Sequence, residues 1–307
     1  MIEKNTKTEC FGGERMQGVV GVVGLGIMGG AMARNLTKAG WEVVGFDIIA
    51  ERRSEAEAAG LAGADSAAAV AARAPTIIMS LPSAAAAHAV ARELAGAKER
   101  RVVVETSTLA LEDKEEIRRV LEAAGHVALD APLSGTGAQA QTGDLVVFAS
   151  GDAATIASLM PMFAGFSREA HDLGAFGNGS RMKFVANLLV AINNVASAEA
   201  MVLAEKAGLD LRQVVKLVGA GAAQSRIFDL RAPMMADNHY LPATMRLSTW
   251  QKDMAVIGAF ASALGAPAPL FRATVPIYDA ANAIGLGDLD VAAVLSVLET
   301  MSGVRRT

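Results

Sequence analysis

The chain has 307 residues, of which 52% are hydrophobic and 20% are charged. This composition excludes an intrinsically disordered protein, and the length is sufficient for about two ordinary domains. The formal net charge of −4 argues against a nucleic-acid-binding protein, because phosphate binding needs a clustered basic face.

The N-terminal segment and the cysteine content indicate in which cellular compartment the protein is found. Cys10 is the only cysteine, so no intrachain disulfide can form. The opening segment Met1–Arg15 is polar and lacks the apolar core of a secretory signal, so we expect residues 1–16 to form a flexible tail. No uninterrupted apolar run reaches the roughly 18 residues of a spanning helix. We therefore expect a cytoplasmic protein with neither membrane nor nucleic-acid partners.

The first half of the chain alternates between strand and helix patterns. The expected strands are Val19–Val23, Glu42–Asp47, Thr76–Leu81, Val102–Glu105, Val127–Asp130 and Leu145–Ala149. The expected helices are Ile27–Lys38, Ala68–Arg73, Ala84–Leu94 and Leu111–Ala124. Alternation at this spacing predicts an α/β domain over residues 17–178, with a doubly wound and largely parallel sheet.

The second half reads as helix throughout. Ser180–Lys206 contains neither Pro nor Gly and predicts one long interdomain helix, about 40 Å in length at about 1.5 Å per residue. Further helices are expected at Leu211–Val218, Met245–Leu264, Pro269–Ala283 and Val291–Met301. We therefore predict an all-helical domain over residues 179–307, which binds substrate and forms contacts between subunits.

A glycine-rich motif follows the first expected strand and opens the first expected helix. Its residues, which match G-x-G-x-x-G, are Gly24, Leu25, Gly26, Ile27, Met28 and Gly29. In this context the glycines permit a tight turn and a close approach of the backbone to a pyrophosphate, while the helix N-terminus offers N–H donors. The motif predicts a Rossmann-type domain that binds a dinucleotide.

Asp47 bears on which dinucleotide is bound. It closes the second expected strand, where a carboxylate hydrogen-bonds the adenosine ribose and repels a 2′-phosphate. Arg52 and Arg53 lie nearby and could offer a contact to such a phosphate, but we interpret them as the solvated start of the next helix. The pattern favours NAD over NADP. His88, His126, His171 and His239 show no metal-ligand spacing, so no metal is expected.

Four ordered segments resemble the β-hydroxyacid dehydrogenase family, which includes 3-hydroxyisobutyrate dehydrogenase and tartronate semialdehyde reductase. Gly24–Gly40 resembles the family's cofactor motif, and Asp130–Leu145 resembles its substrate-binding motif. Gly177–Asn187 resembles its catalytic motif, and Trp250–Asp253 its late Lys-Asp motif. The similarity extends over roughly Val19–Leu298, and it implies a helical domain like the C-terminal one of 6-phosphogluconate dehydrogenase.

The resemblance assigns roles within these segments. It implies that Lys183 is the general acid/base and that Asn187, four residues on and so on the same helix face, binds substrate. Substrate-binding residues are also expected in the loop after the fifth expected strand, Val127–Asp130, and they are Ser134, Gly135 and Thr136. The family usually has glycine at position 136, so the threonine here is expected either to narrow the pocket or to add a hydroxyl group to it, which leaves the identity of the substrate open.

Further positions are assigned to the cofactor by the same resemblance: Leu81, Pro82, Thr108 and Lys252. Together these residues imply an NAD-dependent dehydrogenase or reductase of a small 3-hydroxy acid or its semialdehyde, active as a homodimer or homotetramer. An imine reductase is an alternative, although such enzymes commonly lack the lysine at position 183. A phosphogluconate-type decarboxylating dehydrogenase and a catalytically silent NAD-binding module are further alternatives.

Overall fold

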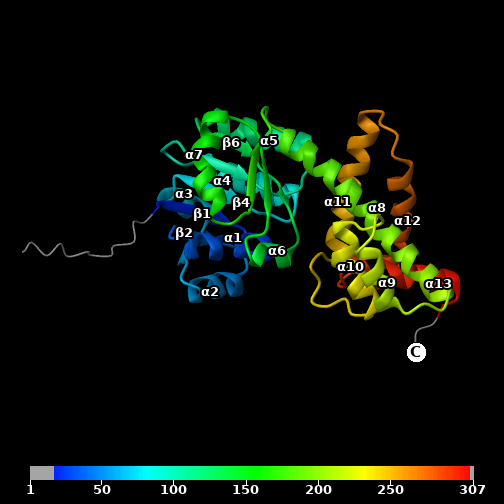
Figure 1. Ribbon diagram of the computed structural model, residues 1–307. Helices are drawn as coiled ribbons and strands as arrows, with labels where there is room; N and C mark the ends of the chain where they lie inside the picture. Colours follow the sequence, from blue (N-terminus) through cyan, green and yellow to red (C-terminus); the bar gives the residue numbers. More distant parts are fainter. Residues whose placement is uncertain (1–16, 305–307) are drawn as a thin grey trace, which may run out of the picture.

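The computed structural model describes residues 17–304, so the segment 1–16, expected to be a tail, lies outside the described residues. Two parts follow one another along the chain (Figure 1). The first is a parallel sheet covered by helices, and the second consists of helices. The long helix α8 runs from the first part into the second.

The main sheet has six strands in the order β3-β2-β1-β4-β5-β6, and every pairing is parallel. Its strands are β1 Val19–Val23, β2 Glu42–Phe46, β3 Ala62–Gly63, β4 Thr76–Met79, β5 Val102–Glu105 and β6 Val127–Asp130. The strand order reverses between β1 and β4. Ligands of such sheets bind at this switch point, outside the carboxyl ends of the strands.

Helices cover both faces of the sheet and bury its apolar residues. On one face, Met32 and Leu36 of α1 join the core, and on the other Val70 of α3 and Leu121 of α5 do so. The helices are α1 Ile27–Lys38, α2 Ala50–Ala58, α3 Ala67–Arg73, α4 Ala84–Leu94 and α5 Leu111–Ala123. This doubly wound arrangement confirms the predicted fold class.

The segment Leu145–Ala149 was expected to belong to the main sheet, and this expectation is wrong. Its strand β8, Val146–Ala149, lies in a second sheet between β7, Leu133–Ser134, and β9, Glu169–Asp172. β7 runs antiparallel to β8, whereas β9 runs parallel to it. The helices α6, Gly137–Gln141, and α7, Ala153–Ala164, connect these strands.

From α8 onward the described chain contains helices. They are α8 Asn178–Lys206, α9 Leu211–Gly219, α10 Arg226–Ala236, α11 Leu247–Ala263, α12 Pro269–Ala283, the 3₁₀ turn η1 Val291–Ala293 and α13 Val294–Ser302. The buried face of α8 supplies Phe184, Val195 and Met201 to their common core. By length and composition alone α8 is also apolar enough to cross a membrane. The search for an uninterrupted apolar run did not detect α8, because asparagines interrupt its apolar sequence.

Candidate active site

The turn between β1 and α1 requires glycine at two positions for steric reasons. Gly24 has a φ of +94°, and a Cβ added there would lie 2.2 Å from the Ser80 carbonyl oxygen. A Cβ on Gly29 would lie 1.8 Å from the Gly24 carbonyl oxygen. A Cβ added on Gly26 would meet only Arg52 Nη1, at 3.7 Å, so there is free space beside the turn at this position.

The N-terminus of α1 offers hydrogen-bond donors at this space. Its N-cap residue, Gly26, has no side chain, and the first turn contains no acidic residue. The backbone N–H groups and the positive end of the helix therefore suit a bound anion. The residues present fit the pyrophosphate of a dinucleotide.

Asp47 follows β2 and is 5% exposed. One carboxylate oxygen, Oδ2, accepts a hydrogen bond from Leu25 N at 2.8 Å, and Oδ1 accepts one from Ile49 N at 2.9 Å. Arg52 Nη1 lies 3.3 Å from Oδ2, and Arg53 donates to the Asp47 carbonyl oxygen at 2.6 Å. Asp47 thus stabilises the glycine-rich turn directly, and both arginines are bound to Asp47.

Lys183 and Asn187 lie on one face of α8, where they are 8% and 4% exposed. Burial lowers the pKa of Lys183 to about 8, since the charged ammonium is poorly solvated there. Asp253 raises this pKa and Lys252 lowers it, each by less than burial does. Asn187 Nδ2 donates to Asp253 Oδ2 at 3.1 Å. A buried amine with such a pKa can accept or donate a proton near neutral pH.

Lys252 connects α11 to the parallel sheet. Its Nζ lies 2.9 Å from Asp253 Oδ1 and also donates to the carbonyl oxygen of Thr108, in the turn after β5. In the same turn, Ser107 Oγ accepts a hydrogen bond from Leu81 N at 2.9 Å. The structure therefore brings Leu81, Thr108 and Lys252 together, and Leu81 also borders Gly24. Pro82, the next residue, is exposed.

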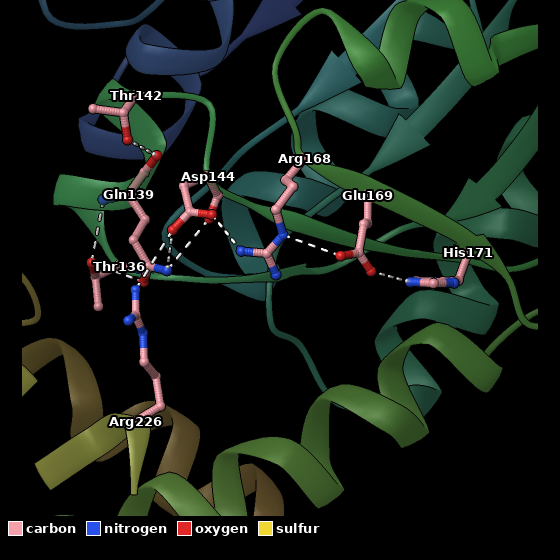
Figure 2. Close-up of polar contacts among 8 residues, drawn as sticks. All are labelled: Thr136, Gln139, Thr142, Asp144, Arg168, Glu169, His171 and Arg226. Atoms are coloured by element: carbon pink, nitrogen blue, oxygen red, sulfur yellow. Dashed lines mark hydrogen bonds and ion pairs between the residues drawn. The ribbon is translucent and has the colours of Figure 1, made fainter. Parts of the chain in front are cut away.

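The segment Ser134–Thr136 links β7 to α6. Ser134 pairs with Val146 in the second sheet, and Gly135 has a φ of +141°, a conformation that favours glycine. Thr136 is the N-cap of α6 and forms a capping box with Gln139 (Figure 2). Its hydroxyl oxygen accepts from Gln139 N at 3.4 Å. The hydroxyl at position 136 is thus engaged by its own helix.

A line of polar contacts continues from α6 along the second sheet (Figure 2). Gln139 Nε2 donates to Asp144 Oδ2 at 3.0 Å, and Arg168 binds both Asp144 and Glu169. From α10, Arg226 approaches Asp144 to 3.8 Å. The hydrogen bond from Gln139, together with the two arginines, lowers the pKa of Asp144. Both parts of the molecule therefore contact this carboxylate.

The start of α6 lies beside the glycine-rich turn between β1 and α1. A Cβ on Gly137 would lie 2.7 Å from Ile27 Cγ2, and Asn35 of α1 donates to the Ala140 carbonyl oxygen at 2.8 Å. Gly137 N also donates to the carbonyl oxygen of Thr244, which precedes α11, at 3.5 Å. The glycine-rich turn, the 134–136 segment and the helical half therefore converge.

Comparison with known families covers nearly the whole chain. Residues 19–174 match the family described as the NAD binding domain of 6-phosphogluconate dehydrogenase. Residues 177–298 match the family described as NAD-binding of NADP-dependent 3-hydroxyisobutyrate dehydrogenase.

Individual relatives agree with these matches. Glyoxylate/succinic semialdehyde reductase 1 from Arabidopsis thaliana is 30% identical, over 91% of this chain and 98% of its own. L-threonate dehydrogenase from Escherichia coli K12 is 30% identical, over 93% and 97%. The crystal structure of 3-hydroxyisobutyrate dehydrogenase from Salmonella typhimurium superposes with a TM-score of 0.82 at 30% identity, over 91% and 99%. The chain belongs to the β-hydroxyacid dehydrogenase family.

This β-hydroxyacid dehydrogenase is accordingly an NAD(P)-dependent oxidoreductase that acts on CH–OH groups of hydroxyacids. Within residues 17–304 no group of three or more His, Cys, Asp or Glu side chains is arranged to hold a metal ion.

Two features of the dehydrogenase were not predicted from its sequence. Asp253 was assigned no role at the site, yet it accepts a hydrogen bond from Asn187 and raises the pKa of Lys183. Lys114 of α5 was overlooked, although it is fully buried between two carboxylates. Its position three residues from both Leu111 and Ile117 places a charge on the apolar face of the helix, and this signal was available.

Proposed function

We propose that this enzyme interconverts a small 3-hydroxy carboxylic acid and its semialdehyde, with Lys183 as the general acid/base. The observation that supports the proposal best is the burial of Lys183, which lowers its pKa to about 8. An ordinary lysine, with a pKa of about 10.4, is a poor base at neutral pH. Asn187, which shares the buried face of α8 with Lys183, is hydrogen-bonded to Asp253, and its amide is suited to bind a hydroxyl substrate.

The substrate carboxylate binds at Ser134, Gly135 and Thr136 in this proposal. Backbone N–H groups and the Ser134 hydroxyl are suitable donors to a carboxylate. Because the Thr136 hydroxyl caps α6, we assign its contribution to the shape of the segment. Asn187 holds a neighbouring substrate oxygen beside Lys183.

For the cofactor we propose NAD in preference to NADP. The turn Gly24–Gly29 would hold the pyrophosphate, and Leu81, Pro82, Thr108 and Lys252 would contact the cofactor between this turn and Lys183. An ionised carboxylate has about four acceptor sites, and three contacts to Asp47 leave one for a ribose hydroxyl. Since Arg52 is already paired with Asp47, its charge is partly neutralised and less available to a 2′-phosphate.

The bound dinucleotide supplies the hydride acceptor or donor, and the protein manages the proton. In oxidation, neutral Lys183 accepts the proton of the substrate hydroxyl; in reduction, the ammonium form returns a proton to the carbonyl oxygen. Asn187 orients that oxygen, and Asp253 orients Asn187 through its amide. Lys252 holds the Thr108 turn against α11 and so helps to close the site.

The test is a panel of substrates assayed at 340 nm with NAD⁺ and NADP⁺. The panel contains 3-hydroxyisobutyrate, glycerate, threonate and 3-hydroxypropionate, with glyoxylate, succinic semialdehyde and cyclic imines in the reducing direction. We expect turnover of a hydroxy acid or semialdehyde, with a higher kcat/KM for NAD⁺. Lys183→Ala should lower kcat by at least about 10²-fold. Lys206→Ala, at the exposed end of the same helix, is the matched control.

Each outcome is informative. Retained turnover in Lys183→Ala would contradict the acid/base role, and turnover of imines alone would identify an imine reductase. Binding of NADH without turnover of any panel member would favour a non-enzymatic NAD-binding protein. A higher kcat/KM with NADP⁺ would overturn the assignment of the cofactor.

We also propose that the enzyme is cytoplasmic and forms a homodimer or homotetramer. The α8 face opposite Lys183 and Asn187 exposes Met182, Val185 and Leu189, whose side chains are 42–57% exposed. An apolar stripe of this kind on a soluble enzyme commonly marks a contact with another chain.

A further inference from the structure

Three buried charged side chains form a cluster at the carboxyl ends of β5 and β6, next to the candidate active site. Glu105 ends β5 and Asp130 ends β6, and the two are paired residues of neighbouring strands. Lys114 of α5 inserts its Nζ between their carboxylates, 3.0 Å from Asp130 Oδ1 and in contact with Glu105 Oε2. The Lys114 and Asp130 side chains are 0% exposed and that of Glu105 is 3% exposed.

The two carboxylates stabilise the buried ammonium group of Lys114. Burial by itself would lower the pKa of Lys114, but Asp130 and Glu105 raise it above its ordinary value. The carboxylate of Asp130 is also stabilised by the N-terminus of α8, where Ser180 N donates to Asp130 Oδ2 at 2.8 Å. The positive end of the helix also stabilises a carboxylate in this position.

Each carboxylate of the cluster binds a different part of the site. Glu105 Oε1 accepts a hydrogen bond from Ser107 N at 2.9 Å, in the turn whose Thr108 carbonyl binds Lys252. Asp130 accepts two bonds from Ser180, from its N–H and its hydroxyl, each at 2.8 Å. Ser180 lies one helical turn before Lys183.

We propose that Glu105, Lys114 and Asp130 are positioning residues, which fix the start of α8, and with it Lys183, relative to the Ser107–Thr108 turn on the cofactor side. The cluster joins these two parts of the site through a single ammonium group. This inference rests on the proposed role of Lys183. A displacement of either part by a fraction of an ångström misaligns the Lys183 amine with the substrate oxygen whose proton it exchanges, and such misplacements lower kcat.

The decisive variant replaces one positive and one negative charge together. In Glu105→Leu/Lys114→Met, Asp130 keeps its donors on α8, and replacing a buried ion pair by apolar residues often leaves stability unchanged. We expect a Tm within about 4 °C of wild type, at least a tenfold lower kcat for the panel substrate used fastest, and an NADH Kd within threefold. The matched control, Glu116→Leu/Arg119→Met, removes an exposed ion pair from the same helix and should leave all three values unchanged.

Wild-type kcat in the folded double variant would overturn the proposal, because the cluster would then serve stability alone. If the double variant does not fold, Ser180→Ala provides the test, since it removes one of the two bonds between Asp130 and α8. We expect kcat to fall threefold to tenfold with little change in Tm, and an unchanged kcat would again overturn the proposal. Lys183→Ala distinguishes the two levels: retained turnover there contradicts the proposed function itself.

Discussion

At the scale of single residues, the proposed proton transfer depends on the environment of Lys183. The amine of Lys183 is buried beside α8. Asp253 and Lys252 lie close enough for the first to raise its pKa and the second to lower it. With a pKa of about 8, the amine exists in both protonation states around neutral pH. The same side chain can therefore act as a base in oxidation and as an acid in reduction.

The pH dependence of the rate follows from this pKa. Oxidation needs neutral Lys183, so its kcat should rise with pH and level off above about pH 8, whereas the kcat of reduction should fall above about pH 8. Asp253→Asn removes the carboxylate that raises the pKa, so its profiles should shift to lower pH. Initial rates between pH 6 and 10 measure both. A shift of the Asp253→Asn profiles to higher pH would contradict the assignment.

At the scale of elements, the short helix α6 determines the conformation of the adjoining 134–136 segment, because Thr136 is its N-cap. Five residues make a marginal helix, and Thr136 stabilises its N-terminus through the capping box with Gln139. The same helix contacts α1 and the residues before α11. Thr136 in place of the glycine usual in the family therefore stiffens this segment.

Substitution of the cap separates this role from direct substrate binding. Thr136→Ala should lower stability by about 0.5–2 kcal/mol, because it leaves a first-turn N–H without its acceptor. Thr136→Ser retains the hydroxyl and should keep the Tm of wild type. Thermal unfolding and KM of both variants are the measurements. A raised KM with an unchanged Tm in Thr136→Ala would indicate that the hydroxyl contacts substrate directly.

At the scale of the whole molecule, the two parts of the chain meet through several contacts around the site. Lys252 binds the Thr108 turn, Arg226 approaches Asp144, and Gly137 binds Thr244. In addition, α8 exposes apolar side chains, and a groove of about 530 Å³ lies between α11 and α12. In the proposed homo-oligomer, the exposed face of α8 would contact a second copy of the chain.

The oligomeric state should respond to a charge on the exposed face of α8. We expect wild type to sediment as a dimer or tetramer at micromolar concentration, and Leu189→Glu to weaken assembly by at least tenfold. Leu217→Glu, on the exposed side of α9, is the control. Sedimentation velocity over a range of concentrations measures this, and a monomeric wild type would refute the expectation.

The sequence was sufficient to predict elements with strong local patterns. The strand Val19–Val23 and the helices Ile27–Lys38 and Ala84–Leu94 have the predicted bounds, because strand, glycine and cap signals coincide there. The polar helix α2, Ala50–Ala58, lacks an apolar stripe, so the sequence indicated a helix at Arg52 and Arg53 but not its bounds. The exposed strand β9, Glu169–Asp172, lacks alternation and was not predicted. The domain boundary between residues 178 and 179 stays a prediction.

For the site, the resemblance supplied Lys183 and Asn187, and α8 carries both on one buried face. The partners of these residues come from distant segments, as Asp253 does for Asn187, and no local pattern indicates such a contact. The cluster of Glu105, Lys114 and Asp130 likewise joins two strand ends and a helix that only the tertiary structure brings together.

The buried amine of Lys183 also has a thermodynamic consequence for folding. In the unfolded chain its pKa returns to the ordinary 10.5, so between pH 8 and 10.5 the unfolded state binds more protons than the native state. Below pH 8 the native enzyme is therefore less stable by about 3 kcal/mol than it would be with an unperturbed lysine, and this deficit diminishes as the pH rises through that interval. The feature that makes Lys183 useful as a base thus opposes folding at neutral pH, and the apolar packing around α8 must compensate for it.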